Sequence, residues 1–186
     1  MRVEVPLAHA SRLLNHGPTV LVASAHGGQR DVMAAAWAMP LDFDPPKVAV
    51  VIDKATFSRG LIEASGELVL AVPCAAQVDM VVGVGHTSGR ELDKFQHFGI
   101  ATEPASRVGA PLIQDCLAWL ECRLYPEPHN QQTYDLFLAE VVAAWADEQA
   151  FVQGHWQDLP QARRALHHLG GGEFFTSAGL IRGRRP

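Results

Sequence analysis

The most constraining feature of this sequence is a series of short strand-like runs separated by turn residues. Thr19–Ser24, Val32–Met39, Lys47–Ile52 and Glu67–Pro73 are each rich in apolar residues and carry few charges. Runs of this length, bounded by Gly, Pro and Asp, are typical of β-strands. No regular alternation of strand and helix connects them. The pattern therefore predicts a mainly β fold, a β-barrel with helical insertions, rather than a Rossmann sheet.

The turn sequences indicate how the first strands are joined. His26–Gln29 contains two glycines and predicts a hairpin that spans Gly17–Met39. Asp42–Pro46 interrupts the chain again before the third run. Within that third run, Val48–Ile52 contains no polar residue, which indicates a strand that is buried on both faces.

A first helix is predicted from its start and stop signals. Thr56 precedes apolar residues at Phe57, Leu61 and Ala64, which share one face of a helix. Gly66 is the expected stop, because glycine readily adopts the left-handed conformation that ends helices.

A second helix is predicted to begin at Ser88–Glu91. This segment has the S-x-x-E form of a capping box, in which side chains satisfy the first free N–H groups of a helix. Leu92, Phe95 and Phe98 would form its apolar face, and Gly99 would end it.

The second half of the chain is less regular. Leu117–Leu124 alternates apolar and polar residues and predicts a strand, whereas Tyr134–Trp145 fits a helix or a strand equally well. Tyr125–Gln132 between them would be a long hairpin connection. Pro160–Leu169 is amphipathic and predicts a helix that Gly170–Gly172 ends.

The composition fits one globular domain spanning residues 1–186. Apolar residues make up 48% of the chain and charged residues 19%, which excludes a disordered protein. Twenty acidic and 15 basic residues give a net charge of −5. This charge argues against nucleic-acid binding, which requires an excess of cations. The one basic cluster, Arg182, Arg184 and Arg185, is expected to be a frayed tail.

Several other classes of protein are also disfavoured. The uncharged apolar runs are too short to span a membrane, and the N-terminus has no signal-peptide core. Cys74, Cys116 and Cys122 form no CxxC motif, which favours a reduced, cytoplasmic protein without structural zinc. The nine histidines form no H-x-x-x-H motif, and no serine or cysteine nucleophile motif occurs. We therefore predict no metal site and no catalytic side chain.

Two predicted helix starts, at Thr56 and Ser88, offer a possible phosphate site. Free N–H groups and the positive end of the helix dipole attract anions. Ser58 adds a hydroxyl group, and the nearby cations are Lys54, Arg59, Arg90 and Lys94. The alternative is that Thr56 and Ser88 only cap their helices, and the residues alone favour this alternative. Gly83–Ser88 lacks the third glycine of the dinucleotide motif and is better explained as a turn.

Seven blocks of this sequence, in a fixed order, resemble one protein family. They are Val32–Trp37, Asp42–Val48, Thr56–Ile62, Ser65–Glu67, Ser88–Phe95, Ala118–Arg123 and Ala139–Val141. From about Gly17 to Val142 the chain resembles the flavin reductase-like family, whose members include flavoredoxin and NAD(P)H:flavin oxidoreductases. The resemblance implies an FMN-binding split β-barrel that forms a homodimer, with FMN, or alternatively FAD, near the subunit interface.

The resemblance also implies which residues hold the flavin. Met33–Trp37 would follow the flavin ring and bind it largely through backbone groups, whereas Asp53–Ser58 and Ser88–Phe95 would hold the phosphate side. The implied cofactor-binding residues are Met33, Ala34, Ala35, Ala36, Trp37, Asp53, Lys54, Ala55, Thr56, Ser58, Ser88, Gly89, Arg90 and Lys94. Combined with the two helix starts, the resemblance favours a phosphate site over simple capping.

Three activities stay open at this point. The first is an NAD(P)H-dependent flavin reductase that moves hydride from nicotinamide to flavin N5 and supplies a partner oxygenase or another acceptor. The second is a flavoredoxin-type electron carrier, favoured by Tyr134, which stands where many reductases have a histidine. The third is a split-barrel protein that has lost flavin. It would bind another ligand instead, and Ala34 and Ala36 motivate it, because many family members have Asn, Thr and Ser where this chain has Asp31, Ala34 and Ala36.

Overall fold

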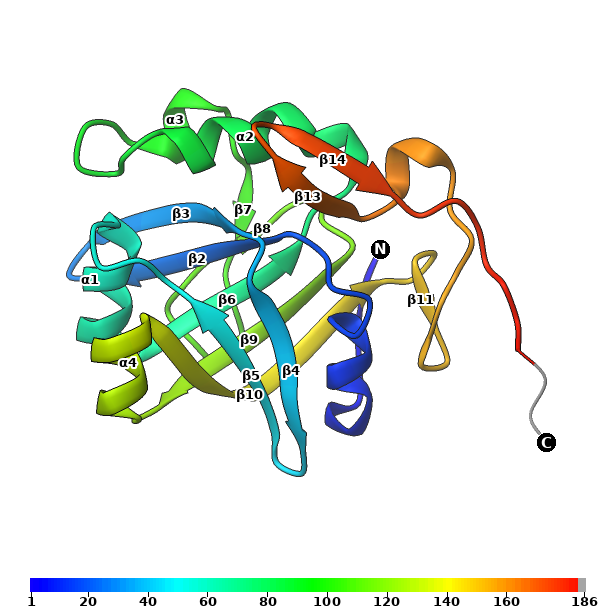
Figure 1. The fold of residues 1–186 in the computed structure, drawn as a ribbon, viewed down its shortest axis with the longest axis horizontal. Helices are drawn as coiled ribbons and strands as arrows, with labels where there is room; N and C mark the ends of the chain where they lie inside the picture. Colours follow the sequence, from blue (N-terminus) through cyan, green and yellow to red (C-terminus); the bar gives the residue numbers. More distant parts are fainter. Residues whose placement is uncertain (184–186) are drawn as a thin grey trace.

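A computed structural model describes residues 1–183, and its main feature is one large antiparallel sheet (Figure 1). The strand order is β3-β2-β6-β9-β10-β5-β4, with β1 beside β10. These strands are β1 (Arg2–Glu4), β2 (Val20–His26), β3 (Gln29–Ala35), β4 (Ala38–Phe43), β5 (Pro46–Val51), β6 (Glu67–Val72), β9 (Ala118–Tyr125) and β10 (Leu136–Asp147). β3 and β4 lie at opposite edges, yet only Ala36 and Trp37 separate them in sequence. The sheet must therefore curl until its edges approach, which gives a split barrel and confirms the predicted fold class.

The predicted hairpin is present, but it ends earlier than expected. β2 and β3 pair from Val20 with Ala35 to His26 with Gln29, and two glycines with positive φ angles form the turn. The predicted second strand, Val32–Met39, is divided between β3 and β4. The division follows from the barrel, because the chain leaves one edge of the sheet at this point and joins the other.

The central strands are buried on both faces. Val22 and Leu70 belong to one core cluster, inside the barrel. Leu21 and Val69, their neighbours in the same strands, belong to a second cluster on the opposite face. That second cluster packs against helix α2 (Val78–His86), which lies above β2 and β3 in Figure 1. β5 is likewise buried at Val48, Ala49 and Val50, as its unbroken apolar run predicts.

The first predicted helix is confirmed as α1 (Phe57–Ser65), and Gly66 ends it with a φ angle of 71°. The predicted capping role of Thr56 is wrong, although Thr56 holds the N-cap position. Its hydroxyl donates to the Asp53 carbonyl oxygen at 2.8 Å and makes no capping hydrogen bond with α1.

The second predicted helix is misplaced. Ser88–Glu91 forms a turn, in which Ser88 Oγ accepts a hydrogen bond from the Arg90 N–H group at 3.2 Å. A four-residue helix, α3 (Lys94–His97), follows it and is capped by the Asp93 side chain. The capping box fails here because Asp93, a better-placed acceptor, begins the helical turn.

The longer helix in this region, α2, contains the glycines that were predicted to form a turn. A Cβ atom at Gly83 would lie 2.5 Å from the Phe98 ring, and one at Gly85 would lie 3.5 Å from Ala34 Cβ. These glycines are therefore helical positions at which neighbouring side chains approach closely. Because glycine has a low helix propensity, the sequence of this segment does not predict a helix.

The ambiguous segment Tyr134–Trp145 is mostly strand, because β10 pairs with both β5 and β9 along its length. The strand predicted at Leu117–Leu124 is confirmed as β9. The connection predicted at Tyr125–Gln132 contains helix α4 (Pro128–Tyr134), with proline in its first turn.

The helix predicted at Pro160–Leu169 is wrong. A short 3-10 helix, η3 (Gln161–Arg163), is followed by the hairpin of β13 (Leu166–Gly170) and β14 (Glu173–Thr176). The three glycines, which all have positive φ angles, form the hairpin turn rather than a helix stop. Of the predicted basic tail, Arg184 and Arg185 lie outside the described residues.

The remaining elements are short: η1 (Leu7–Leu13), η2 (Ala75–Gln77), β7 (Thr102–Glu103), β8 (Leu112–Ile113), β11 (Phe151–Val152) and β12 (His155–Trp156). Within residues 1–183, no helix has the length and apolar character needed to cross a membrane.

Candidate functional site

A large cavity lies between the β3–β4 link and helix α2. It consists of two adjoining parts, which we call the apolar hollow, about 440 Å³, and the polar hollow, about 420 Å³. Both parts share Met33, Ala34, Asp53, Gly85 and His86. Each volume lies within the range of small-molecule binding sites.

The apolar hollow is bounded by the segment that crosses the barrel opening. Met33–Trp37 forms one wall. Val81 and Val82 of α2, together with Phe174 of β14, form another. Its walls are mostly apolar, and the alanines leave the backbone of the β3–β4 link accessible to a flat ligand.

The two hollows meet where α2 approaches β3 most closely. Gly85 lies so near Ala34 that a Cβ atom on the glycine would already be in van der Waals contact. Small residues at both positions keep the passage between the hollows open. The arrangement creates one continuous space with different chemistry at its two ends.

The polar hollow contains the N-terminal end of α1. Thr56, Phe57 and Ser58 line it, and among residues 1–183 no side chain caps this helix end. The Asp53 carboxylate instead accepts a hydrogen bond from the Ala55 N–H group at 2.6 Å and closes the preceding turn. The first N–H groups of α1 and its dipole are therefore available to an anion.

A buried ion pair lies at the base of the polar hollow. Lys94 Nζ donates to the carbonyl oxygens of Val32 at 2.7 Å and Val84 at 3.1 Å, and it lies 3.4 Å from Asp31 Oδ1. Ser58 Oγ donates to the other oxygen of Asp31 at 2.7 Å. Burial lowers the pKa of Lys94, although the neighbouring Asp31 charge opposes this effect. The pair joins β3, α1, α2 and α3, the four elements that surround this hollow.

Gly89 allows the turn after α2 to lie against this ion pair. A Cβ atom on Gly89 would lie 2.5 Å from Asp31 Oδ1 and 2.6 Å from the Phe57 ring, closer than van der Waals contact permits. The absence of a side chain at Gly89 thus brings the backbone of this turn to the edge of the polar hollow.

The structure brings most of the predicted site residues together. All of them except Lys54 and Arg90 line one hollow or the other. Arg90 still supports the site, because its guanidinium donates to the Ala55 carbonyl oxygen at 2.6 Å and joins the two turns. Arg59, a candidate cation, instead donates to Asp135 and to the Gln131 carbonyl oxygen and holds α4.

Sequence reasoning missed the part of the cavity that comes from α2 and the C-terminal hairpin. Val81, His86, His168 and Phe174 line the apolar hollow, but the elements that carry them were not predicted. The helical spacing of apolar residues in Val78–Val84 was an available signal. The histidine and glycine content of the hairpin gave no comparable signal.

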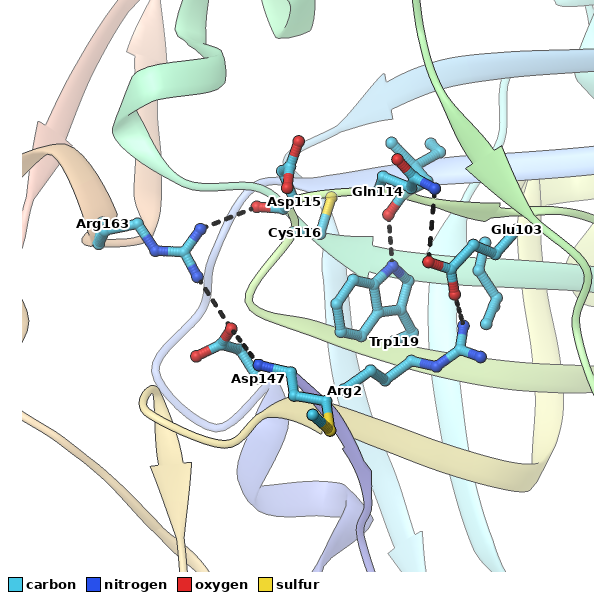
Figure 2. A pocket seen from close by; sticks show the side chains of 11 residues that line it. Arg2, Glu103, Gln114, Asp115, Cys116, Trp119, Asp147 and Arg163 are labelled. Carbon is cyan, nitrogen blue, oxygen red and sulfur yellow. Dashed lines mark hydrogen bonds and ion pairs between the residues drawn. The ribbon is translucent and has the colours of Figure 1, made fainter.

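A second, smaller cavity of about 240 Å³ lies elsewhere in the molecule (Figure 2). Both of its arginines already pair with carboxylates: Arg2 Nη1 lies 3.0 Å from Glu103, and Arg163 Nη2 lies 3.2 Å from Asp147. Burial raises the pKa of Cys116 in its wall far above the ordinary value, so this thiol is not reactive. Among residues 1–183, no group of three His, Cys, Asp or Glu residues is arranged to hold a metal ion.

Comparisons with known proteins identify the family. The family model for the flavin reductase like domain matches residues 12–167. The chain belongs to the flavin reductase-like family. It is 47% identical over 178 residues to the uncharacterized protein YddH of Escherichia coli K12, covering 94% of each chain.

Solved structures agree with this assignment. An FMN-binding domain of a flavin reductases-like enzyme from Shewanella baltica OS155 is 44% identical, with a TM-score of 0.96 over 99% of this chain and 98% of that one. Flavoredoxin of Desulfovibrio vulgaris (Miyazaki F) shares the fold at 24% identity, with a TM-score of 0.79 over 90% of both chains. The fold is therefore the FMN-binding split barrel of this family, and flavin binding is supported.

The cavity itself fits a flavin nucleotide. A flavin nucleotide has a flat ring at one end and a phosphate at the other. The apolar hollow offers small residues beside an accessible backbone, and the polar hollow offers an uncapped helix N-terminus. The two hollows adjoin at Ala34 and Gly85, and their different polarity matches the two ends of such a ligand.

Proposed function

We propose that this protein is an FMN-binding oxidoreductase, with NADH or NADPH as its reductant. The observation that carries the proposal is the single elongated cavity with an apolar end and a polar end. The flavin ring would lie in the apolar hollow against Met33–Trp37, and the phosphate would lie in the polar hollow. FAD is the alternative cofactor.

We assign the phosphate contacts to the backbone N–H groups at the start of α1 and to Thr56 and Ser88. Lys94 and Arg90 stabilise the segments that would make these contacts. The Lys94 ammonium group is held by two carbonyl oxygens and Asp31, so it contributes a fixed positive charge beneath the hollow. Arg90 fastens the Ser88 turn to Ala55.

When bound, FMN supplies the redox chemistry by taking hydride at N5 and passing electrons to an acceptor, such as a partner oxygenase. The chain binds and orients the reactants and excludes water. Ala34 and Ala36 leave room for a ring beside the backbone, and Trp37 forms the outer end of this wall. No side chain is assigned a catalytic role.

An electron carrier that works with a protein partner is the second candidate. Among residues 1–183, no Lys or Arg lines the apolar hollow, so the pyrophosphate of a nicotinamide dinucleotide would find no cation there. Tyr134 is largely exposed and offers an aromatic surface to a partner. Both observations favour an acceptor or donor that exchanges electrons without entering the cavity.

We also propose that the protein forms a homodimer through its β4 edge. Trp37, Met39, Leu41 and Phe43 follow one another along this edge as an apolar stripe, and all are exposed, with Trp37 and Phe43 each 75% exposed. A bulge between Pro40 and Asp42 turns Phe43 to the opposite face of the strand from Met39. Such a stripe on an edge strand is typical of an interface. A second copy would cover the stripe by two-fold symmetry, and it would lie beside the cavity because Trp37 belongs to both.

The protein is proposed to work in the reducing cytoplasm. Cys74, Cys116 and Cys122 are all free and buried, as expected for a protein that needs no disulfide.

The test is a visible spectrum of purified protein with added FMN, followed by NADH or NADPH without oxygen. Bound flavin that is bleached by a nicotinamide within seconds would support the reductase. Bound flavin that neither nicotinamide bleaches, but that a reduced electron-transfer protein does, would favour the carrier. Protein that binds no FMN would overturn both proposals and leave a split barrel that has lost flavin.

A further inference from the structure

The C-terminal hairpin supplies a wall of the apolar hollow. His168 of β13 and Phe174 of β14 pair directly across the hairpin, with ring centroids 5.2 Å apart. Both line the hollow together with Gly172 of the turn. The matched family region ends at residue 167, so these three residues lie beyond it.

The two faces of this hairpin differ because side chains alternate along a strand. Phe174 packs against the core cluster that contains Val81 of α2. Phe175, the next residue, pairs with His167 on the opposite face and is 65% exposed. One face of the hairpin therefore belongs to the cavity, and the other faces away from it.

The hairpin is held firmly at its base. The Thr19 N–H group donates to the Leu166 carbonyl oxygen at 2.7 Å, and His167 Nδ1 lies 3.0 Å from the Gly17 carbonyl oxygen. Arg164 donates to the carbonyl oxygen of Ser177, just after β14, at 2.8 Å. At the other end, Gly172 lies against Val82 of α2. These contacts fix Phe174 in place at the cavity wall. Figure 1 shows the β13–β14 hairpin beside α2.

The charges around the apolar hollow restrict what can enter it. Asp53 lines the hollow, whereas no Lys or Arg does so within residues 1–183. His86 and His168 also line the hollow. An anionic reactant would therefore lie near Asp53 and would find no Lys or Arg in the described lining to pair with.

We infer that the β13–β14 hairpin determines which reactant reaches the flavin, and that Phe174 selects flat, uncharged aromatic or conjugated rings. The inference rests on the proposed function, because the ring would stack between Phe174 and the bound flavin. Aromatic rings gain from packing against one another, whereas a charged group would lose its water without gaining a partner.

The experiment compares Phe174→Ala with the matched control Phe175→Ala, which removes the same side chain from the opposite face. FMN affinity is measured first for each variant. The FMN-loaded proteins are then titrated at about pH 8 with 2-naphthol and with 2-naphthalenesulfonate, which has the same ring and a negative charge. Perturbation of the flavin absorption spectrum reports binding without any turnover. Phe174→Leu repeats the measurement with a side chain that preserves most of the packing volume.

We expect Phe174→Ala to weaken 2-naphthol binding about tenfold, Phe174→Leu to weaken it less, and Phe175→Ala to change it less than about twofold. The sulfonate should bind the wild type at least about tenfold more weakly than 2-naphthol. Equal effects of the Phe174 and Phe175 variants, or equal binding of the two probes, would overturn this inference alone. Failure of the wild type to bind FMN would overturn the proposed function and this inference together.

Discussion

At the scale of single residues, the shape of the polar hollow depends on Gly89, which has no side chain. The turn that carries Ser88 can lie against Asp31 and Phe57 only because Gly89 has no side chain. Its φ angle lies outside the left-handed region, so the requirement is for space and not for an unusual backbone conformation. Asp31 cannot move away easily, because Ser58 and Lys94 hold it from two sides.

Gly89→Ala is therefore expected to destabilise the protein by about 1–3 kcal/mol, the usual cost of adding an atom to a packed site. Gly60→Ala is the matched control, since Gly60 lies in α1 with nothing within 4 Å of a new Cβ atom. The control should be neutral or slightly stabilising, because alanine is the better helix former. Urea unfolding of both variants measures the difference. Equal stability of the two would show that the turn can move away from Asp31.

Only some residues of the candidate site could be predicted from the sequence. Thr56 and Ser88 could be proposed from sequence, because hydroxyl residues before helices or turns are local signals. The contacts of Lys94 could not, since its partners Val32, Val84 and Asp31 are distant in sequence or lie on elements that were not predicted. Only the fold shows that this cation is already held by the protein.

At the scale of elements, Glu121 joins β9 to the long connection before it. Glu121 is fully buried and accepts hydrogen bonds from the Ser106 N–H and hydroxyl groups at 3.0 Å and from Trp145 Nε1 at 2.8 Å. Burial alone would raise the pKa of Glu121. The donors from Ser106, Trp145 and Arg107 outweigh it, and they hold this pKa below the ordinary value.

Glu121→Gln should cost about 2–4 kcal/mol, because an amide N–H₂ group would face buried donors and the carboxylate charge would be lost. Because the pKa of Glu121 is lowered by folding, its contribution is present above the ordinary pKa of 4.5 and is lost as the pH falls below it. The stability difference between wild type and variant should therefore shrink below pH 4.5.

Glu67→Gln is the control for this prediction, since Glu67 Oε2 holds the same connection through the Gly109 N–H group but is partly exposed. It should cost less than about 1 kcal/mol. Denaturant unfolding at a series of pH values measures both variants. A Glu121→Gln difference that does not depend on pH would contradict the assigned ionisation.

The elements differ in how far sequence could predict them. The strands β2, β5 and β6 could be predicted because runs of apolar residues there have strand length and turn residues beside them. The strand β9 could be predicted because its apolar and polar residues alternate. The helix α2 could not be predicted, because Gly83 and Gly85 lower the helix propensity of its sequence. These glycines instead allow the close approach of Phe98 and Ala34. The sequence of the β13–β14 hairpin predicts a helix instead, because three consecutive glycines such as Gly170–Gly172 fit the end of a helix as well as a tight turn between strands.

At the scale of the whole molecule, the two edge strands of the sheet, β3 and β4, differ in what covers them. β3 carries the wall of the cavity and is covered by α2, whereas within residues 1–183 β4 pairs with β5 alone and its other edge makes no strand pairing. The link between them, Ala36–Trp37, therefore joins the proposed flavin site directly to the proposed dimer interface. Cofactor binding and assembly are expected to be coupled through this link.

Phe43→Glu and Met39→Glu are expected to convert the dimer to a monomer, because each places a charge within the apolar stripe that a second copy would bury. The monomer should also bind FMN at least about tenfold more weakly, since Trp37 would lose the neighbour that orders it beside the ring.

Val152→Glu, a charge placed at an exposed apolar residue of β11 outside the stripe, is the control and should change neither property. Light scattering after size exclusion gives the mass, and fluorescence titration gives the FMN affinity. If both stripe variants retain the wild-type mass, the dimer does not form through β4. If they become monomers with unchanged FMN affinity, the flavin site is complete within one chain.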